Sequence, residues 1–289
     1  MGKRIWIVAG GLGATGIVFG GVTMLGWMLN ETRFDRQSED FDSLTTQIET
    51  LPGVSVQDAQ RWVEAPTFSN LSSRIGLTVA EANLPGLLDA ACAGDHPETT
   101  TWSFRVETES NNAVFVHGDS TPTNVSGGSG CINFGFDAVG FVGEVDAIVP
   151  GAPSGLDLQP TIWGGQFALV ELSERVGGIT TLLPLVAHAD GLRDAAGMDS
   201  NQSVEINADT LSLIIEPGEQ DRYSALLSTL INDHGVTSFW ADGGGTPTDG
   251  VEKVQIVAPD EEHAAIGDAI RTSGLHIADF PVRFIPLTP

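Results

Sequence analysis

Three residue types of a catalytic triad occur together in the stretch VHGDST, at His117, Asp119 and Ser120. Nucleophilic catalysis requires a serine, a histidine and an acid that converge in space, whereas residues adjacent in a turn point in different directions. We therefore interpret Asp119 as a turn-capping residue. The stretch GGSG at 127–130 lacks the G-x-S-x-G spacing of a nucleophile elbow. The sequence thus predicts no catalytic residue and favours a protein that is not an enzyme.

Metal and cofactor motifs are also missing from the sequence. The histidines show no H-x-x-H or H-E-x-x-H spacing, and the aspartates of two acidic stretches do not follow the EF-hand pattern; these aspartates are Asp190, Asp194, Asp199, Asp242 and Asp249. The stretch GGLGATG at 10–16 superficially fits a dinucleotide-binding loop, but it lies within an apolar segment. We predict no metal and no cofactor.

The chain contains two cysteines, Cys92 and Cys131. A single pair in an oxidising compartment predicts one disulfide bond, which would close a loop of about 40 residues. The alternative is two buried free thiols.

The sequence indicates different environments for two tryptophans. Trp102 alternates with Phe104 and Val106, which is typical of the buried face of a strand. Trp163 is followed by Gly164 and Gly165, and we regard it as a candidate contact residue for a partner, although a position in the core is the stronger alternative.

Residues 5–29 are apolar apart from two threonines. As a helix they would extend for roughly 37 Å, which is enough to cross a hydrocarbon core of about 30 Å. The run is too long for a signal peptide and lacks an A-x-A site, so we expect a retained transmembrane anchor; a cleaved leader is the alternative. Lys3 and Arg4 place residues 1–4 in the cytoplasm and the remaining chain outside it.

Small residues share one face of this expected helix, at the positions Ala9, Gly13, Gly16 and Gly20. Such faces allow transmembrane helices to approach closely, so the pattern is compatible with a homodimer or with docking on a partner helix. The alternative is that these glycines reflect only the ordinary composition of membrane helices.

The rest of the chain shows a repeated order of elements. Pro-Gly pairs occur at 52–53 and 150–151, and Leu-Pro pairs occur at 84–85 and 183–184, so both features recur after almost the same interval. Chance similarity between helix-and-strand chains is the alternative. We predict an α+β architecture of tandem α-β-β-α-β type units, each a small sheet with helices on one face. The expected segments are a juxtamembrane linker, unit 1, a Gly/Ser/Thr-rich linker, unit 2 and a shorter unit 3, at 30–40, 41–118, 119–133, 134–218 and 219–289.

The net charge of the protein favours some classes of binding partner over others. The chain has 38 acidic and 13 basic residues, for a net charge of −25, which disfavours nucleic acid and favours basic partners. We expect a non-catalytic binding or scaffold protein of a bacterial cell envelope, held at the membrane through residues 5–29, with a protein or cell-wall partner. The alternatives are an extracytoplasmic enzyme with a cleft between units and a ligand-sensing domain that acts through a membrane partner.

Overall fold

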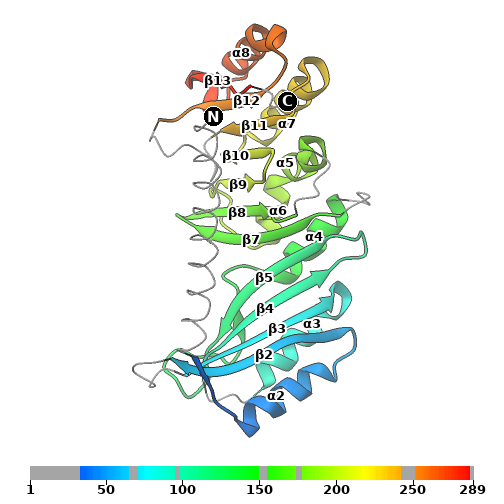
Figure 1. The fold of residues 1–289 in the computed structure, drawn as a ribbon, viewed down its shortest axis with the longest axis vertical. Coiled ribbons are helices and arrows are strands. Elements are labelled where there is room, and N and C mark those ends of the chain that lie inside the picture. The colour runs from blue at the N-terminus through cyan, green and yellow to red at the C-terminus, as the bar shows by residue number, and fades with distance from the viewer. Residues whose placement is uncertain are drawn as a thin grey trace, which may run out of the picture.

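The strands of the protein form one continuous mixed sheet. The computed structural model describes residues 33–64, 71–94, 98–149, 155–173, 178–241 and 251–286. Within these residues, 13 strands join in a single sheet, and they follow one another across it in the order of the chain; only β6 lies off this path, paired with β5. Figure 1 shows the labelled helices together on one side of the sheet, so the described residues form one layer of strands and one layer of helices.

The first half of the described chain builds the lower part of the sheet in Figure 1. Its elements are β1 (Arg33–Asp35), α2 (Glu39–Glu49), β2 (Val54–Glu64), β3 (Leu71–Ala80), α3 (Leu84–Ala93), β4 (Thr100–Glu107), β5 (Ala113–Ser120) and β6 (Ile132–Asn133).

The second half continues the same sheet with shorter strands. Its elements are α4 (Ala138–Ile148), β7 (Asp157–Trp163), β8 (Gln166–Glu171), α5 (Leu183–Ala187), α6 (Ala189–Ala195), β9 (Val204–Asn207), β10 (Leu211–Ile215), α7 (Gln220–His234), β11 (Ser238–Ala241), β12 (Val254–Val257), α8 (His263–Thr272) and β13 (Val282–Phe284).

Strand pairing alternates regularly along the sheet. Strands joined by a tight turn are antiparallel, as in β4–β5 and β7–β8, and β2 is also antiparallel to β3. Strands joined through a helix are parallel, as in β3–β4, β5–β7 and β8–β9. The smallest structural repeat is therefore one helix followed by two strands. Two such repeats account for the interval between the Pro-Gly pairs in the sequence.

This pairing corrects the predicted architecture. The expectation of tandem units with separate small sheets is wrong, because the last strand of each unit pairs with the first strand of the next. At the first junction Val114 of β5 lies opposite Leu158 of β7. At the second junction Leu211 of β10 lies opposite Phe239 of β11. Both pairs are buried, so the sheet and its core continue through the predicted boundaries.

The expected membrane helix cannot be placed in this architecture. Residues 5–29, with Ala9, Gly13, Gly16 and Gly20, lie outside the described residues. Among the helices that the structure does describe, none combines the length and the apolar character needed to cross a bilayer.

Local sequence explains the positions of the helices. The Ser38 hydroxyl accepts a hydrogen bond from the Phe41 N–H at the start of α2, and the Asp137 carboxylate accepts from Val139 and Gly140 at the start of α4. The helices α3 and α5 instead carry proline in their first turn, where no N–H is required. Each of these helices turns its apolar side toward the sheet.

A chain of aromatic rings connects the two halves of the core. Only two residues of β5 pair with β7, and the other end of β5 pairs with β6. The residues after β6 supply rings that contact both halves, with neighbouring ring centroids 5.6–6.2 Å apart. In order of contact the rings are those of Trp102, Phe104, Phe134, Phe136, Phe141 and Phe167. Packed aromatic pairs contribute to stability beyond the area that they bury. This series of rings therefore joins the two halves into one core.

Candidate functional site

A pocket of about 660 Å³ lies where the described chain begins, between β1, the start of α2 and the end of β2. This volume is within the usual range for ligand sites, roughly 300–1,000 Å³. We call it the β1–α2 pocket. Its lining residues are Arg33, Asp35, Arg36, Gln37, Phe41, Asp42, Ala59, Gln60, Arg61 and Trp62.

The pocket forms because the chain leaves the sheet after β1. Strand β1 pairs with β2 through three residues, ending with Asp35 opposite Trp62. The Arg36 N–H then donates to the Arg61 carbonyl over 2.8 Å, and the chain turns away to begin α2 after Ser38. The departing chain and the first turn of α2 form one side of the pocket, and β2 forms the other.

Arg61 is held rigidly at the pocket. Its Nε and Nη2 atoms donate to the two carboxylate oxygens of Glu98, over 2.6 and 2.9 Å. Its Nη1 atom donates to the carbonyls of Arg36 and Gln37, over 3.2 and 3.3 Å. The Ser73 hydroxyl also contacts Glu98. The guanidinium therefore connects the pocket to the loop before β4, and bidentate geometry restricts its orientation.

The other two arginines are more accessible. The Arg33 guanidinium lies 5.0 Å from the centre of the Trp62 ring, and its Nε atom is 3.8 Å from the Glu64 carboxylate. Arg36 is exposed, and within the described part of the chain its guanidinium makes no ion pair. Arg36 is thus the pocket cation with the most freedom to bind a ligand.

The charges of the pocket are mixed. Three arginines meet here in a chain with only 13 basic residues, although the net charge of the protein is −25. Asp35 and Asp42 also line the pocket. A ligand with one acidic group and a polar or basic remainder fits this arrangement, whereas a densely charged polyanion would be repelled by the two carboxylates.

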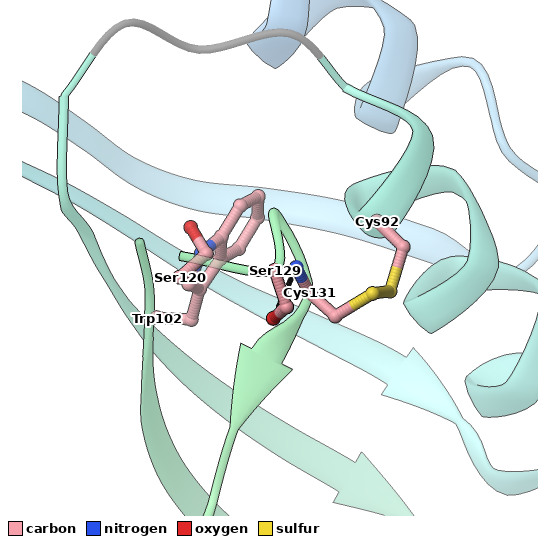
Figure 2. The surroundings of a disulfide bond; sticks show 5 residues. All are labelled: Cys92, Trp102, Ser120, Ser129 and Cys131. Carbon is pink, nitrogen blue, oxygen red and sulfur yellow. Dashed lines mark hydrogen bonds between the residues drawn. A yellow bond between two sulfur atoms is a disulfide. The ribbon is translucent and has the colours of Figure 1, made fainter. Parts of the chain in front are cut away.

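The structure contains the predicted disulfide. Cys92, in the last turn of α3, is bonded to Cys131, just before β6, with the two Cα atoms 4.0 Å apart. Figure 2 shows the bond next to Trp102 and Ser120, where the Trp102 Nε1–H donates to the Ser120 hydroxyl over 2.9 Å. The disulfide fixes the end of α3, from which the chain continues to Glu98, the partner of Arg61.

The residues of the VHGDST stretch do not converge. They lie on β5, where His117 and Asp119 project from the face opposite the described helices and Ser120 projects into the core. The His117 Nδ1 atom is 3.0 Å from the Ser103 hydroxyl, and Asp119 accepts from Thr101 over 2.7 Å. Burial, with the nearby Arg74 charge, lowers the pKa of His117. These are cross-strand pairs rather than a triad.

Trp163 is exposed at the β7–β8 hairpin, so the alternative that placed it in the core is wrong. Its Nε1–H donates to the Glu205 carboxylate over 2.5 Å. Whether Trp163 contacts a partner stays a prediction. Trp102 is buried, as the strand pattern indicates.

Of the aspartates considered for calcium, the structure describes Asp190, Asp194 and Asp199, and it does not gather them into a site. Asp190 and Asp194 both pair with Arg193, at 2.7 and 3.0 Å. Asp242 and Asp249 lie outside the described residues. In the described ranges, no group of three or more histidine, cysteine or acidic side chains is arranged to hold a metal ion.

Acidic residues from both halves meet at the junction of α3, α4 and the β4–β5 turn. Glu81 lies just before α3, and its Oε2 atom is buried without a hydrogen-bond partner in the described structure. Asp146 of α4 accepts from the Ser110 N–H over 2.7 Å. Burial, together with the charges of Asp146 and Glu109, raises the pKa of Glu81 above its ordinary value of 4.5.

We expect the substitution Glu81→Gln to stabilise the protein at pH 7. Because the pKa is raised in the folded state, losing the proton costs more free energy there than in the unfolded state, so the contribution of Glu81 to stability falls as pH rises from about 4.5 through the folded-state pKa. Urea unfolding at pH 4 and pH 7 measures the effect, with the exposed Asp89→Asn as control. A variant no more stable than the wild type at pH 7 would contradict this prediction.

Comparison of the chain with protein-family models, with curated proteins and with solved structures finds no match. Its function must therefore be argued from the site.

Proposed function

We propose that this chain is an extracytoplasmic binding protein whose β1–α2 pocket holds a polar ligand bearing an acidic group. The observation that carries the proposal is the meeting of Arg33, Arg36 and Arg61 at one pocket of a strongly acidic protein. Guanidinium groups recognise carboxylates and phosphates through paired hydrogen bonds. Arg61 is already paired with Glu98, which leaves Arg36 as the group that binds the ligand.

The rigidity of the pocket supports binding. The lining residues of β2 belong to a strand that pairs with β3 from Val54 to Val63, with one irregularity between Val56 and Asp58, and the Arg61 side chain is only 15% exposed. A pocket held in this way needs little ordering when a ligand enters, so less of the interaction energy is lost.

The disulfide supports a location outside the cytoplasm, because such bonds persist in oxidising compartments. Attachment to a membrane rests on the sequence of residues 5–29 alone. In this proposal, the pocket serves a partner or ligand of the cell envelope.

The geometry favours a binding function over the enzyme alternative. An enzyme with its cleft between the units would draw the lining residues of its pocket from more than one unit. All the lining residues of the β1–α2 pocket instead lie between Arg33 and Trp62, at one end of the sheet.

Calorimetric titration of the protein with small probes tests the proposal. We expect N-acetyl-L-alanine, which has one carboxylate, to bind, and glucose, which has no charge, not to bind. Loss of a charge-assisted hydrogen bond costs about 1.5–3 kcal/mol, so Arg36→Ala should weaken binding by roughly tenfold or more.

The matched control is Arg271→Ala. Arg271 is another exposed arginine, paired with Asp268 on α8, far along the sheet from the pocket. The proposal is wrong if the carboxylate probe does not bind, or if Arg36→Ala and Arg271→Ala bind it equally well.

A further inference from the structure

Among the described strands, none covers the outer edge of β2 next to the β1–α2 pocket, except at its last three residues. Strand β2 has 11 residues, but β1 pairs only with its last three, Trp62–Glu64. In the described part of the chain, no strand pairs with residues 54–60 on this side. An unpaired edge of this kind is the surface to which an extended peptide adds as a further strand.

The contacts of Arg61 show which backbone N–H and carbonyl groups of β2 face the outer edge. Its carbonyl accepts from the Arg36 N–H, so the polar backbone groups of Arg61 point to the outer edge. Alternate residues of an antiparallel strand point to the same side, so the N–H and carbonyl of Ala59 also face outward. Ala59 is exposed and lines the pocket. Its small side chain leaves room for a neighbouring chain.

The pocket lies at the end of this free edge where β1 leaves the sheet. A peptide parallel to β2 would run from the side of Val54 toward Arg61 and bring its C-terminus to Arg36. A peptide in the opposite direction would bring its ammonium group there instead. The guanidinium of Arg36, which has no ion-pair partner among the described residues, favours the carboxylate and therefore the parallel direction.

The acidic groups of the pocket add a second preference. Asp35 and Asp42 line it together with Arg36, and the protein as a whole has a net charge of −25. Basic side chains near the C-terminus of a peptide would lie close to these carboxylates, and the overall field would attract a basic segment.

We infer that the ligand is a basic peptide segment with a free C-terminal carboxylate, which adds to the edge of β2 as a parallel strand. This inference rests on the proposed function and specifies its ligand. The backbone of the peptide would pair with Ala59, its carboxylate would bind Arg36, and its basic side chains would lie near Asp35 and Asp42.

Peptide arrays test the inference. The probes are random decapeptides immobilised through their N-termini, enriched in lysine and arginine, in versions with a free C-terminal carboxylate and with a C-terminal amide. We expect the free-acid peptides to bind and the amides to bind about tenfold more weakly or not at all. N-methylation of alternate backbone nitrogens in a bound peptide should also abolish binding, because it removes the donors that pair with a strand.

The variant Ala59→Pro tests the contribution of the β2 backbone to the same strand pairing. Proline removes an N–H that faces the outer edge and leaves the ladder to β3 intact, so the variant should fold. It should lose at least tenfold in affinity for the free-acid peptides. The N-methylated peptides provide an independent test if this variant is unstable.

The outcomes separate the two proposals. If N-acetyl-L-alanine binds through Arg36 but amidation, N-methylation and Ala59→Pro leave peptide binding unchanged, the peptide inference is wrong and the proposed function stands. If neither the small carboxylate nor any free-acid peptide binds, both are wrong.

Discussion

Loss of the Cys92–Cys131 disulfide lowers the free energy of unfolding by about 4 kcal/mol. The two cysteines are 39 positions apart, and in the chain-entropy model the unfolded state is stabilised by about this amount when such a loop is opened. The bond joins the end of α3 to the segment before β6, so its loss also removes a constraint on the end of α3. Urea unfolding of the oxidised protein and of the Cys92→Ser/Cys131→Ser double variant measures the difference.

Reducing agent provides the control for this experiment. It should destabilise the wild-type protein by the same amount as the double variant, and it should leave the double variant unchanged. Equal midpoints for the oxidised protein and the double variant would show that the bond contributes nothing to stability and would contradict the prediction.

Replacing Phe141 with alanine lowers the free energy of unfolding by about 3–5 kcal/mol. Phe141 is fully buried on α4, and its ring contacts those of Phe136 and Phe167, with centroids 6.1 and 5.6 Å away. The cavity left by the ring would lie in the aromatic chain that joins the two halves. Because the sheet is continuous, we expect one cooperative transition at a lower urea concentration, followed by circular dichroism and tryptophan fluorescence.

The matched control lies on the same helix. Val139 is 39% exposed, so Val139→Ala should change the stability by no more than about 0.5 kcal/mol. Two separate transitions in Phe141→Ala, with one half unfolding before the other, would show that the halves behave as independent domains. That result would contradict the single core described above.

The local elements of this fold are visible in the sequence, whereas their assembly is not. Amphipathic patterns and the Pro-Gly and Leu-Pro pairs indicate the helices, the hairpins and their recurrence. They do not indicate which strand edges meet. Val114 and Leu158 are apolar strand residues that would suit two separate small sheets equally well, and only their parallel pairing across α4 makes one sheet. Long-range pairing of this kind is decided by global packing rather than by local pattern.

The candidate pocket was largely hidden in the sequence for a similar reason. Arg33 and Arg36 belong to the polar segment 30–40, which is predicted to be a linker, and the three-residue strand β1 is too short to produce a period-two pattern. Arg61 lies on another strand and reaches this segment only through the pairing of β1 with β2. The one available signal was the presence of two arginines within four positions of a chain so poor in basic residues.

The order of the strands has a consequence for how the chain folds. Each strand, apart from β6, has as its neighbours in the sheet the strands that precede and follow it in sequence. Contact order is therefore low for a sheet of this size, and proteins with low contact order tend to fold fast. Loop closure is needed only between adjacent repeats, so the sheet can grow from its first strands while later ones are still being synthesised.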